Sequence, residues 1–134
     1  MIRDIDVRIT APVNDTEVTG RVEDAITNVF PEADIESHPG ELRATCHSME
    51  HLSELLHEQA ILDTARGAFF GGQEGETFEF GLKKQAALRG VVNFAVGGES
   101  ELGDIRVRVR VNDPDVEAFV DHVAPRTEDG TPIE

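Results

Sequence analysis

A chain of 134 residues is long enough to form one domain with a buried core. Its 27 Asp and Glu outnumber its 12 Lys and Arg, and the formal charge of −15 argues against indiscriminate binding to nucleic acid or anionic membranes. A lone cysteine, Cys46, excludes an internal disulfide, no apolar run approaches the eighteen or so residues of a membrane span, and the amino terminus lacks a signal-peptide pattern. We therefore expect a cytoplasmic protein that does not associate with membranes.

The charge composition also predicts the environment of the protein. Lys83 and Lys84 are the only lysines, and tyrosine and tryptophan are absent. An excess of carboxylates keeps a protein soluble, but it makes the compact state repel itself when salt is removed. The composition therefore favours a halophilic protein adapted to a salt-rich cytoplasm, and an acidic protein of an ordinary cytoplasm is the alternative.

Apolar periodicity predicts helices and strands along nearly the whole chain. In chain order these are a strand over 5–11, a helix closed by Pro31, a hairpin of strands 33–37 and 41–47, one bent or two consecutive helices between Ser48 and Phe69, strands over 78–82, 91–96 and 105–111, and a helix opened by Asp113 and Pro114 that runs to Val123.

The connections carry signals of their own. Asn14, three residues before Glu17, has the spacing of a capping box at the start of the first helix. In the hairpin, Pro39 and Gly40 fit the central positions of a type II turn. Residues 71–75 and 97–103 are glycine-rich or polar and are expected to form loops.

The predicted helices and strands do not alternate one for one. This order favours a single α+β domain over residues 1–124, with a mixed or mostly antiparallel sheet and helices packed on one of its faces. Residues 125–134 are polar, and we expect a disordered tail there.

No catalytic or metal-binding constellation stands out. The loop 71–75 lacks the Gly-Lys-Ser/Thr ending of a P-loop, and its glutamates would repel phosphate. Cys46, His47 and His51 lie close together but lack zinc-type spacing, so Cys46 is better described as a small buried hydrophobe. Because no carboxylate pair has a recognisable acid/base spacing, we expect no catalytic residues, metal or cofactor.

Two groups of cations are candidates for binding. One group projects from one face of its predicted strand and consists of Arg106, Arg108 and Arg110. These arginines form either a nucleic-acid-binding stripe or a solvated sheet face whose charges balance nearby acids such as Glu99, Glu101 and Asp104. Lys83 and Lys84 with Arg89 are the second group, and the alternative there is a solvated turn. Both groups stay open at this point.

Two motifs carry a resemblance to a known family. The segment Ile61-Leu62-Asp63-Thr64-Ala65-Arg66, followed by Lys84-Gln85-Ala86-Ala87 and Gly90-Val91-Val92-Asn93-Phe94, resembles an archaeal family of uncharacterised proteins labelled RNA-binding. The likeness runs from Ile5 to about Val123. It implies a fold similar to that of the ribosomal protein that holds the small ribosomal RNA of the large subunit.

The resemblance also implies site residues and partners. Asp63, Arg66, Lys84, Gln85 and Asn93 are the polar residues that match the family pattern, whereas Lys83 and Val91 depart from it. With neighbouring cations added, the predicted RNA-binding residues are Arg66, Lys83, Lys84, Gln85, Arg89 and Asn93.

We further expect Arg66, Lys84 and Arg89 to lie near one another, with Lys83 at the edge of the patch they form. The leading hypothesis is a non-catalytic RNA-binding protein associated with ribosomal or structured RNA, and no DNA partner is expected. The alternative is an accessory or regulatory partner of a P-loop kinase of the dephospho-coenzyme A type. The sequence does not fix the oligomeric state.

Overall fold

The computed structural model describes residues 4–95, 103–128 and 131–132. Its main feature is a six-stranded sheet in the order β2-β3-β1-β6-β5-β4, in which every neighbouring pair is antiparallel. The elements are β1 (Asp4–Pro12), α1 (Thr19–Val29), β2 (Asp34–His38), β3 (Glu41–Cys46), α2 (Glu50–Glu58), α3 (Leu62–Gly71), β4 (Gln73–Glu74), β5 (Thr77–Leu82), α4 (Lys84–Leu88), β6 (Ile105–Asp113), α5 (Val116–Val123), β7 (Thr127–Glu128) and β8 (Thr131–Pro132).

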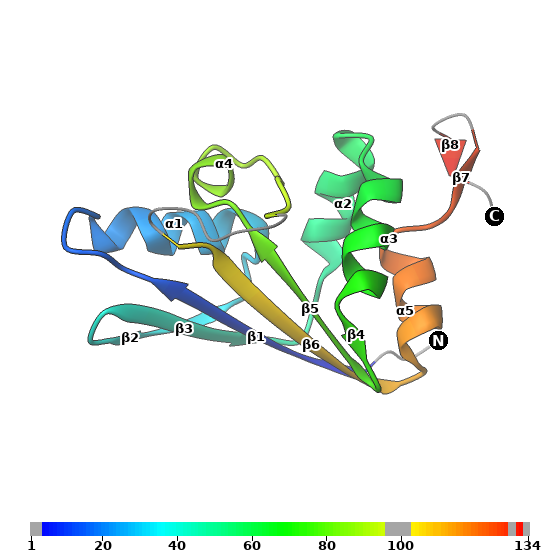
Figure 1. Cartoon of the computed structure of the whole chain (residues 1–134), viewed down its shortest axis with the longest axis horizontal. Helices are drawn as coiled ribbons and strands as arrows, with labels where there is room; N and C mark the ends of the chain where they lie inside the picture. The colour runs from blue at the N-terminus through cyan, green and yellow to red at the C-terminus, as the bar shows by residue number, and fades with distance from the viewer. Residues whose placement is uncertain (1–3, 96–102, 129–130, 133–134) are drawn as a thin grey trace.

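All five of these helices cover one face of the sheet (Figure 1). Helices α1 and α4 lie over one half, and α2, α3 and α5 lie over the other half. On the opposite face of the sheet, which we call the open face, the described residues form no layer of helices or strands (Figure 1). This arrangement confirms the predicted α+β class with helices on one side of an antiparallel sheet.

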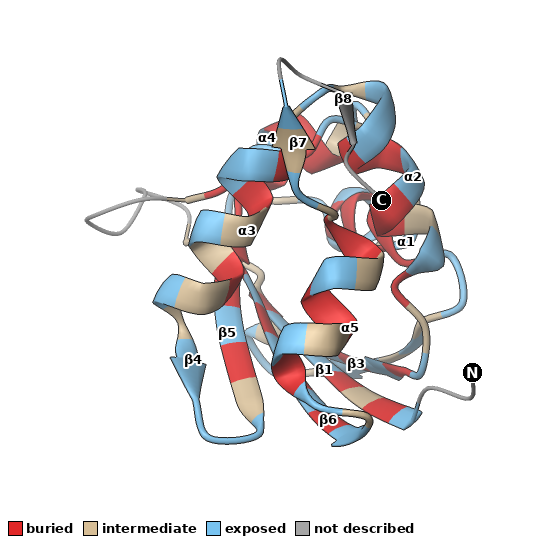
Figure 2. Cartoon of the chain, turned by 90° about the vertical axis from the view of Figure 1, so that its right-hand side faces the viewer, coloured by how far each residue is buried: buried red, intermediate tan, exposed pale blue. Residues whose placement is uncertain are grey.

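The core lies between the sheet and the helices because apolar residues alternate along the strands. In β1 and β6 every second residue is buried and the residues between them are mostly exposed, as the banding in Figure 2 shows. Phe69 of α3 lies at the centre of an aromatic cluster, with ring centroids 5.1 Å from Phe78 and 4.9 Å from Phe80. Such tilted aromatic pairs add about 0.5–1.5 kcal/mol each to the burial of their area. This cluster joins α3 firmly to β5.

The segment that follows β5 differs from the prediction of a turn and a second buried strand. Residues 84–88 form α4, and Phe94 makes only an isolated bridge to Leu82. The short helix forms because its own Ala86 and Ala87 are buried and because the Asn28 side chain donates hydrogen bonds to the carbonyls of Ala87 and Leu88, each at 3.0 Å. Tertiary packing therefore determines the secondary structure of residues 84–88, whose apolar pattern alone is ambiguous.

Two predicted helix starts are displaced. Glu17 accepts a hydrogen bond from the backbone N–H of Asn14 at 3.0 Å, as a capping box would, but α1 begins only at Thr19. For α5 the cap is Asp115, whose carboxylate accepts from the Ala118 N–H at 2.8 Å, and not Asp113. The predicted turn is present, because Gly40 has a φ of 79° between β2 and β3.

The remaining expectations concern the loops and the end of the chain. The helical region after Ser48 is two helices, α2 and α3. Residues 97–102 of the expected polar loop lie outside the described residues, together with Glu99 and Glu101. Within the expected tail, β7 pairs with β8, and the domain boundary at residue 124 and the disorder of the tail stay predictions.

Candidate functional site

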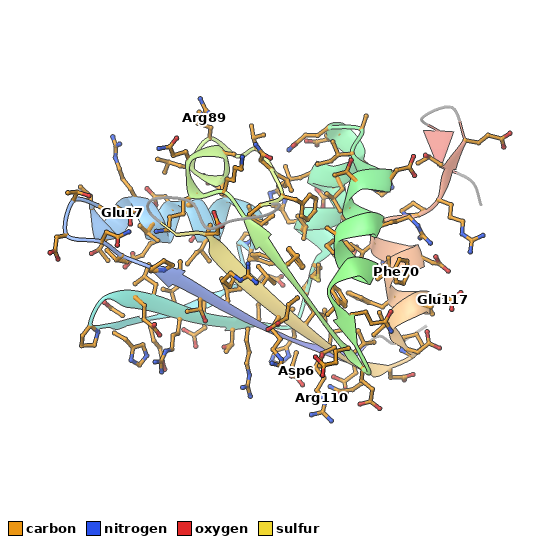
Figure 3. All side chains as sticks on the ribbon, viewed as in Figure 1. Asp6, Glu17, Phe70, Arg89, Arg110 and Glu117 are labelled. Atoms are coloured by element: carbon orange, nitrogen blue, oxygen red, sulfur yellow. The ribbon has the colours of Figure 1, made fainter. Side chains whose placement is uncertain are left out.

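The open face of the sheet carries five arginines in its three central columns. They are Arg8 of β1, Arg43 of β3, and Arg106, Arg108 and Arg110 of β6. Each is exposed and stands between two buried neighbours on its strand, so its side chain points away from the helices. Figure 3 shows this direction for Arg110, which projects from the side of the sheet opposite α1 and α4.

Strand register brings these arginines together. Arg8 is directly opposite Arg108, and Thr10 lies between Arg106 on one side and Arg43 on the other. Like charges directly opposite each other on neighbouring strands destabilise a sheet. In a protein with 27 acidic residues, an Arg–Arg pair at the centre of the sheet is therefore an unfavourable local choice for the fold itself.

The ion pairs on this face leave the arginines largely available. Arg108 and Arg110 lie 3.7 Å from carboxylates of Glu79 and Glu76, and their side chains keep 59% and 62% of their exposure. Arg43 pairs with Glu41. Within residues 4–95 and 103–128, neither Arg8 nor Arg106 has an ion-pair partner. Exposed pairs of this kind are worth at most about 1 kcal/mol, so an incoming anion can compete with them.

Acidic side chains lie both among the arginines of the same face, where Asp6 stands on β1 and Glu41 on β3, and at its edges. Asp34 and Glu36 stand on β2, in register with Thr45 and Arg43 of β3, and Glu74 stands on β4 in register with Thr77. Positive charge is therefore concentrated on the central strands. A polyanion that reaches the open face is attracted to the middle of the sheet and repelled at its margins.

A shallow hollow marks the middle of the open face. Its volume is about 250 Å³, and its lining consists of Asp6, Arg8, Thr77, Arg108 and Arg110. Asp6 is in register with Arg110, and it also lies 3.3 Å from His47. Three guanidinium groups around one hollow provide the planar hydrogen-bond donors that match phosphate oxygens.

Lys84, one of the RNA-binding residues predicted from the sequence, lies inside the protein. Its side chain is 8% exposed and forms an ion pair with Glu17, Nζ to Oε1 2.9 Å, while its ammonium also donates to the Pro12 carbonyl. Glu17 itself is 13% exposed. Burial alone would raise the pKa of the Glu17 carboxyl, but hydrogen bonds from Asn14 and Lys84 hold that pKa below its ordinary value. The pair therefore ties α4 to the segment before α1.

Arg66 is also engaged within the fold. Its guanidinium donates to Asp121 at 2.7 Å and to the Ala124 carbonyl at 2.9 Å, and it stacks 5.3 Å from the centroid of Phe70. These contacts join α3 to the end of α5. Figure 3 shows Arg89, which directly follows α4, well separated from Phe70 on α3. The expected patch of Arg66, Lys84 and Arg89 does not form, because Arg66 faces α5 and not α4.

The other predicted residues are exposed and lie around α4. Lys83, Gln85, Arg89 and Asn93 are all exposed, and the Lys83 N–H donates to the Asn93 carbonyl at 2.9 Å. Arg89 stands on the helix side of the molecule, away from Arg110 (Figure 3). The structure therefore presents two separate cationic surfaces, the open face and the smaller α4 surface.

Two arginines of the open face were not singled out from the sequence. Arg8 and Arg43 each sit alone in their own strands, and only the pairing of β1 with β6 and with β3 brings them beside the arginines of β6. Their alternation with buried residues was a usable signal, because it already placed both on an exposed sheet face.

Comparison with known proteins assigns the chain to a family. A family model described as RNA binding matches residues 6–111, which include the whole open-face arginine group. The chain belongs to this RNA-binding family. A UPF0201 protein of Thermococcus onnurineus is 38% identical, with 96% of this chain and 98% of the relative covered. A crystal structure of a UPF0201 protein from Methanococcus jannaschii has a TM-score of 0.88 at 36% identity and covers 96% of this chain and 99% of its own.

One relative is much longer than this family member. A protein of Archaeoglobus fulgidus named UPF0200/UPF0201 is 35% identical over 99% of this chain, yet the chain spans only 41% of its length.

None of the helices within residues 4–95 and 103–128 is long and apolar enough to cross a membrane. The same part of the chain holds no group of three His, Cys, Asp or Glu side chains that could bind a metal ion. Cys46 is buried, and burial raises the pKa of its thiol, in keeping with the small hydrophobe expected from the sequence.

Proposed function

We propose that this protein binds RNA through the open-face arginines, with the guanidinium groups held against backbone phosphates. The observation that carries the proposal is the register that sets Arg8 opposite Arg108. Such a pair costs the free protein stability, and a bound anion between the two side chains turns that repulsion into attraction. The match of the family model described as RNA binding over residues 6–111 supports the same reading.

Charge distribution explains how so acidic a protein can take a polyanion. With a formal charge of −15, the molecule as a whole repels RNA at low salt. In molar salt the Debye length falls to about 3 Å, so long-range repulsion is screened while direct contacts persist. Bidentate guanidinium–phosphate hydrogen bonds are contacts of this kind. Binding therefore depends on the local arginine geometry and not on net charge.

The test removes the two facing charges. The variants Arg8→Gln and Arg108→Gln, alone and combined, are compared with Arg21→Gln, an exposed arginine on α1. We expect the double variant to bind RNA at least about tenfold more weakly, because charged hydrogen bonds contribute about 1.5–3 kcal/mol each. Its melting temperature should stay level or rise, since relief of cross-strand repulsion is worth about 0.2–1 kcal/mol.

Fluorescence anisotropy with labelled RNA and thermal melting give the two readouts. Weaker binding together with undiminished stability is the signature of residues kept for function at the expense of the fold. If the double variant binds RNA as well as Arg21→Gln does, the open face is not the binding surface.

The α4 surface is the second location for RNA contact within this proposal. Lys83, Gln85, Arg89 and Asn93 are exposed there, whereas Arg66 and Lys84 would have to leave partners inside the protein to reach RNA. Hydrogen bonds from Gln85 or Asn93 would add specificity that phosphate contacts lack. The variant Arg89→Gln separates the two surfaces, because it changes only the α4 surface.

We propose a halophilic archaeal protein associated with ribosomal or other structured RNA in the cytoplasm, with a fold like that of the ribosomal protein named above. The alternative is a partner of a P-loop kinase of the dephospho-coenzyme A type. The UPF0200/UPF0201 protein of Archaeoglobus fulgidus supports the alternative, because a chain like this one makes up only 41% of its length and is joined there to further sequence. Copurification from the native host separates the two: bound RNA supports the first and a kinase subunit supports the second.

A further inference from the structure

The centre of the open face carries hydroxyl groups as well as charged side chains. Beside the arginines stand Thr10 and Thr45, both exposed. Thr45 is in register with Arg8, and Thr10 is in register with Arg43 and Arg106. Neither threonine hydroxyl has a hydrogen-bond partner within the described part of the chain. The centre of the face thus offers guanidinium donors alternating with free hydroxyl groups.

Phenylalanine side chains are missing from this face within the described residues, and the sequence contains no tyrosine or tryptophan. Six of the seven phenylalanines are buried in the core, among them Phe78 and Phe80 on the helix-facing side of β5. The seventh, Phe70, is half-buried in α3 beside Arg66. Sheets that bind single-stranded RNA stack its unpaired bases on exposed aromatic rings. Among the described residues, the rings at the open face are the imidazoles of His38 on β2 and of His47 beside Asp6, which are smaller than the rings of phenylalanine, tyrosine or tryptophan.

Neighbouring residues and strand spacing fix the positions of the three arginines on β6. The Arg106 guanidinium lies over Gly81 of β5, so closely that a Cβ at Gly81 would come within 3.0 Å of the Arg106 Nη1 atom. Along β6 the three arginines stand at every second residue, which spaces them by about 7 Å. This row extends over several phosphates of one nucleic-acid strand, while Arg8 and Arg43 provide cations on the two strands beside it.

We propose that the open face binds double-stranded RNA through its ribose–phosphate backbone, with the arginines on phosphates and the Thr10 and Thr45 hydroxyls on ribose 2′-hydroxyls. The inference rests on the RNA-binding function proposed above and adds the class of RNA. Duplex RNA presents phosphates and 2′-hydroxyl groups across its shallow minor groove and hides the faces of its bases. A face rich in arginine and threonine, without phenylalanine, tyrosine or tryptophan, complements that surface and offers unpaired bases few large rings for stacking.

The acidic margins of the sheet leave room for a duplex over the central strands. A duplex is stiff and touches a protein only where its surface reaches, so it can rest on the central strands and avoid Asp34, Glu36 and Glu74. Recognition by backbone alone also predicts little dependence on base sequence.

The experiment compares three matched probes at about 1 M potassium chloride and at lower salt. They are a blunt RNA duplex of about 16 base pairs, the DNA duplex of the same sequence, and one RNA strand that does not pair with itself. With the full chain we expect the RNA duplex to bind at least about tenfold more tightly than either of the others. Arg8→Gln with Arg108→Gln should weaken duplex binding, whereas Arg21→Gln on α1 should not.

Two further variants test the chemistry of the face. Thr10→Val with Thr45→Val removes both hydroxyls at nearly constant shape, so affinity for the RNA duplex should fall several-fold while affinity for the DNA duplex stays unchanged. Thr45→Phe adds an exposed ring, and it should raise affinity for the single strand by about fivefold or more if the natural face lacks only a stacking platform.

The outcomes separate this inference from the function on which it rests. If no RNA probe binds, the RNA-binding function itself fails. If the single strand binds as tightly as the duplex, or RNA and DNA duplexes bind equally, the protein still binds RNA but the duplex-backbone inference is overturned. A preference for the RNA duplex that disappears in the threonine double variant, while its melting temperature is kept, supports it.

Discussion

At the scale of single residues, the Glu17–Lys84 pair shows how a cation can be conspicuous in the sequence and yet serve the fold. Lys84 is 8% exposed and Glu17 is 13% exposed, with 2.9 Å between Nζ and Oε1. The pKa of Glu17 lies below its ordinary value of 4.5, because hydrogen bonds outweigh the cost of burial. A group whose pKa is depressed on folding stabilises the protein above the unfolded pKa, and this stability is lost as the pH falls through the folded pKa.

We therefore predict that Glu17→Gln lowers the free energy of unfolding at neutral pH by about 1–3 kcal/mol, the usual cost of leaving a charged group short of a partner. As the pH falls below 4.5, the wild-type protein should lose its advantage over this variant. Denaturant unfolding at a series of pH values measures the difference. The control is Lys83→Gln, at the exposed position next to Lys84 in the chain, and it should change the free energy of unfolding by no more than about 0.5 kcal/mol. A constant gap between Glu17→Gln and wild type at all pH values would contradict the assignment.

The residue scale also shows where reading the sequence was limited. Lys83 and Lys84 look alike in the chain, and only the partner 67 positions away distinguishes the buried one from the exposed one. Arg8 likewise becomes part of a cationic cluster only through its pairing with Arg108, which lies a hundred residues later in the chain. Alternation predicted that Arg106, Arg108 and Arg110 share an exposed face, because a strand's period is local. Pairings between distant strands are not local, so they could not be predicted.

At the scale of elements, two helices end in the same way with different residues. After α2, the Ile61 N–H donates to the Leu56 carbonyl and the Ala60 N–H to the His57 carbonyl, and after α4 the Val91 and Gly90 N–H groups do the same with Ala86 and Ala87. Both are Schellman ends, which place one residue in the left-handed region. That residue is Ala60, with a φ of 55°, in the first and Gly90, with a φ of 75°, in the second.

This pair of helix ends predicts opposite effects from reciprocal substitutions. Ala60→Gly should stabilise the protein by about 0.5–1 kcal/mol, because glycine adopts the left-handed region without steric cost. Gly90→Ala should destabilise it by about 1–2 kcal/mol through the backbone alone, since no atom lies within 4 Å of the added Cβ. Chemical denaturation of both variants beside the wild type measures the two changes. Effects of the same sign would show that neighbouring packing, and not backbone conformation, governs these positions.

Elements with strong periodicity were predicted well and the short ones were not. The strands over 5–11 and 105–111 match β1 and β6, because nine-residue strands with one buried face leave an unambiguous pattern. Helix α4 has only five residues, too few to establish a helical period, and its stability comes from α1 and Asn28. The break between α2 and α3 lies at Ala60, a residue type that gives no warning of a left-handed turn.

At the scale of the whole molecule, the formal charge of −15 governs the response to salt. Within the described chain most ion pairs are exposed and involve few of the carboxylates, so repulsion among the remaining acids opposes folding whenever screening is weak. We predict that the melting temperature falls steadily as potassium chloride is reduced from about 1 M to about 0.01 M, over which the Debye length grows from about 3 Å to about 30 Å.

Differential scanning calorimetry across this salt series measures the effect. Sodium chloride at equal ionic strength is the control, because a purely electrostatic response does not depend on which monovalent cation provides the screening. A melting temperature that stays level over the series would remove the support for a halophilic protein, while the fold and the open face would be unaffected.

The pairing of β1 with β6 has a consequence for the order of events during synthesis. These two strands lie side by side at the centre of the sheet, yet one occupies residues 4–12 and the other residues 105–113. A growing chain leaves one side of β1 without its neighbour until most of the polypeptide has been made, and contacts so distant in sequence are slow to form. Arg8 and Arg108 come together only at that late stage. A nascent chain therefore has no preassembled arginine surface with which to capture the RNA that surrounds it on the ribosome.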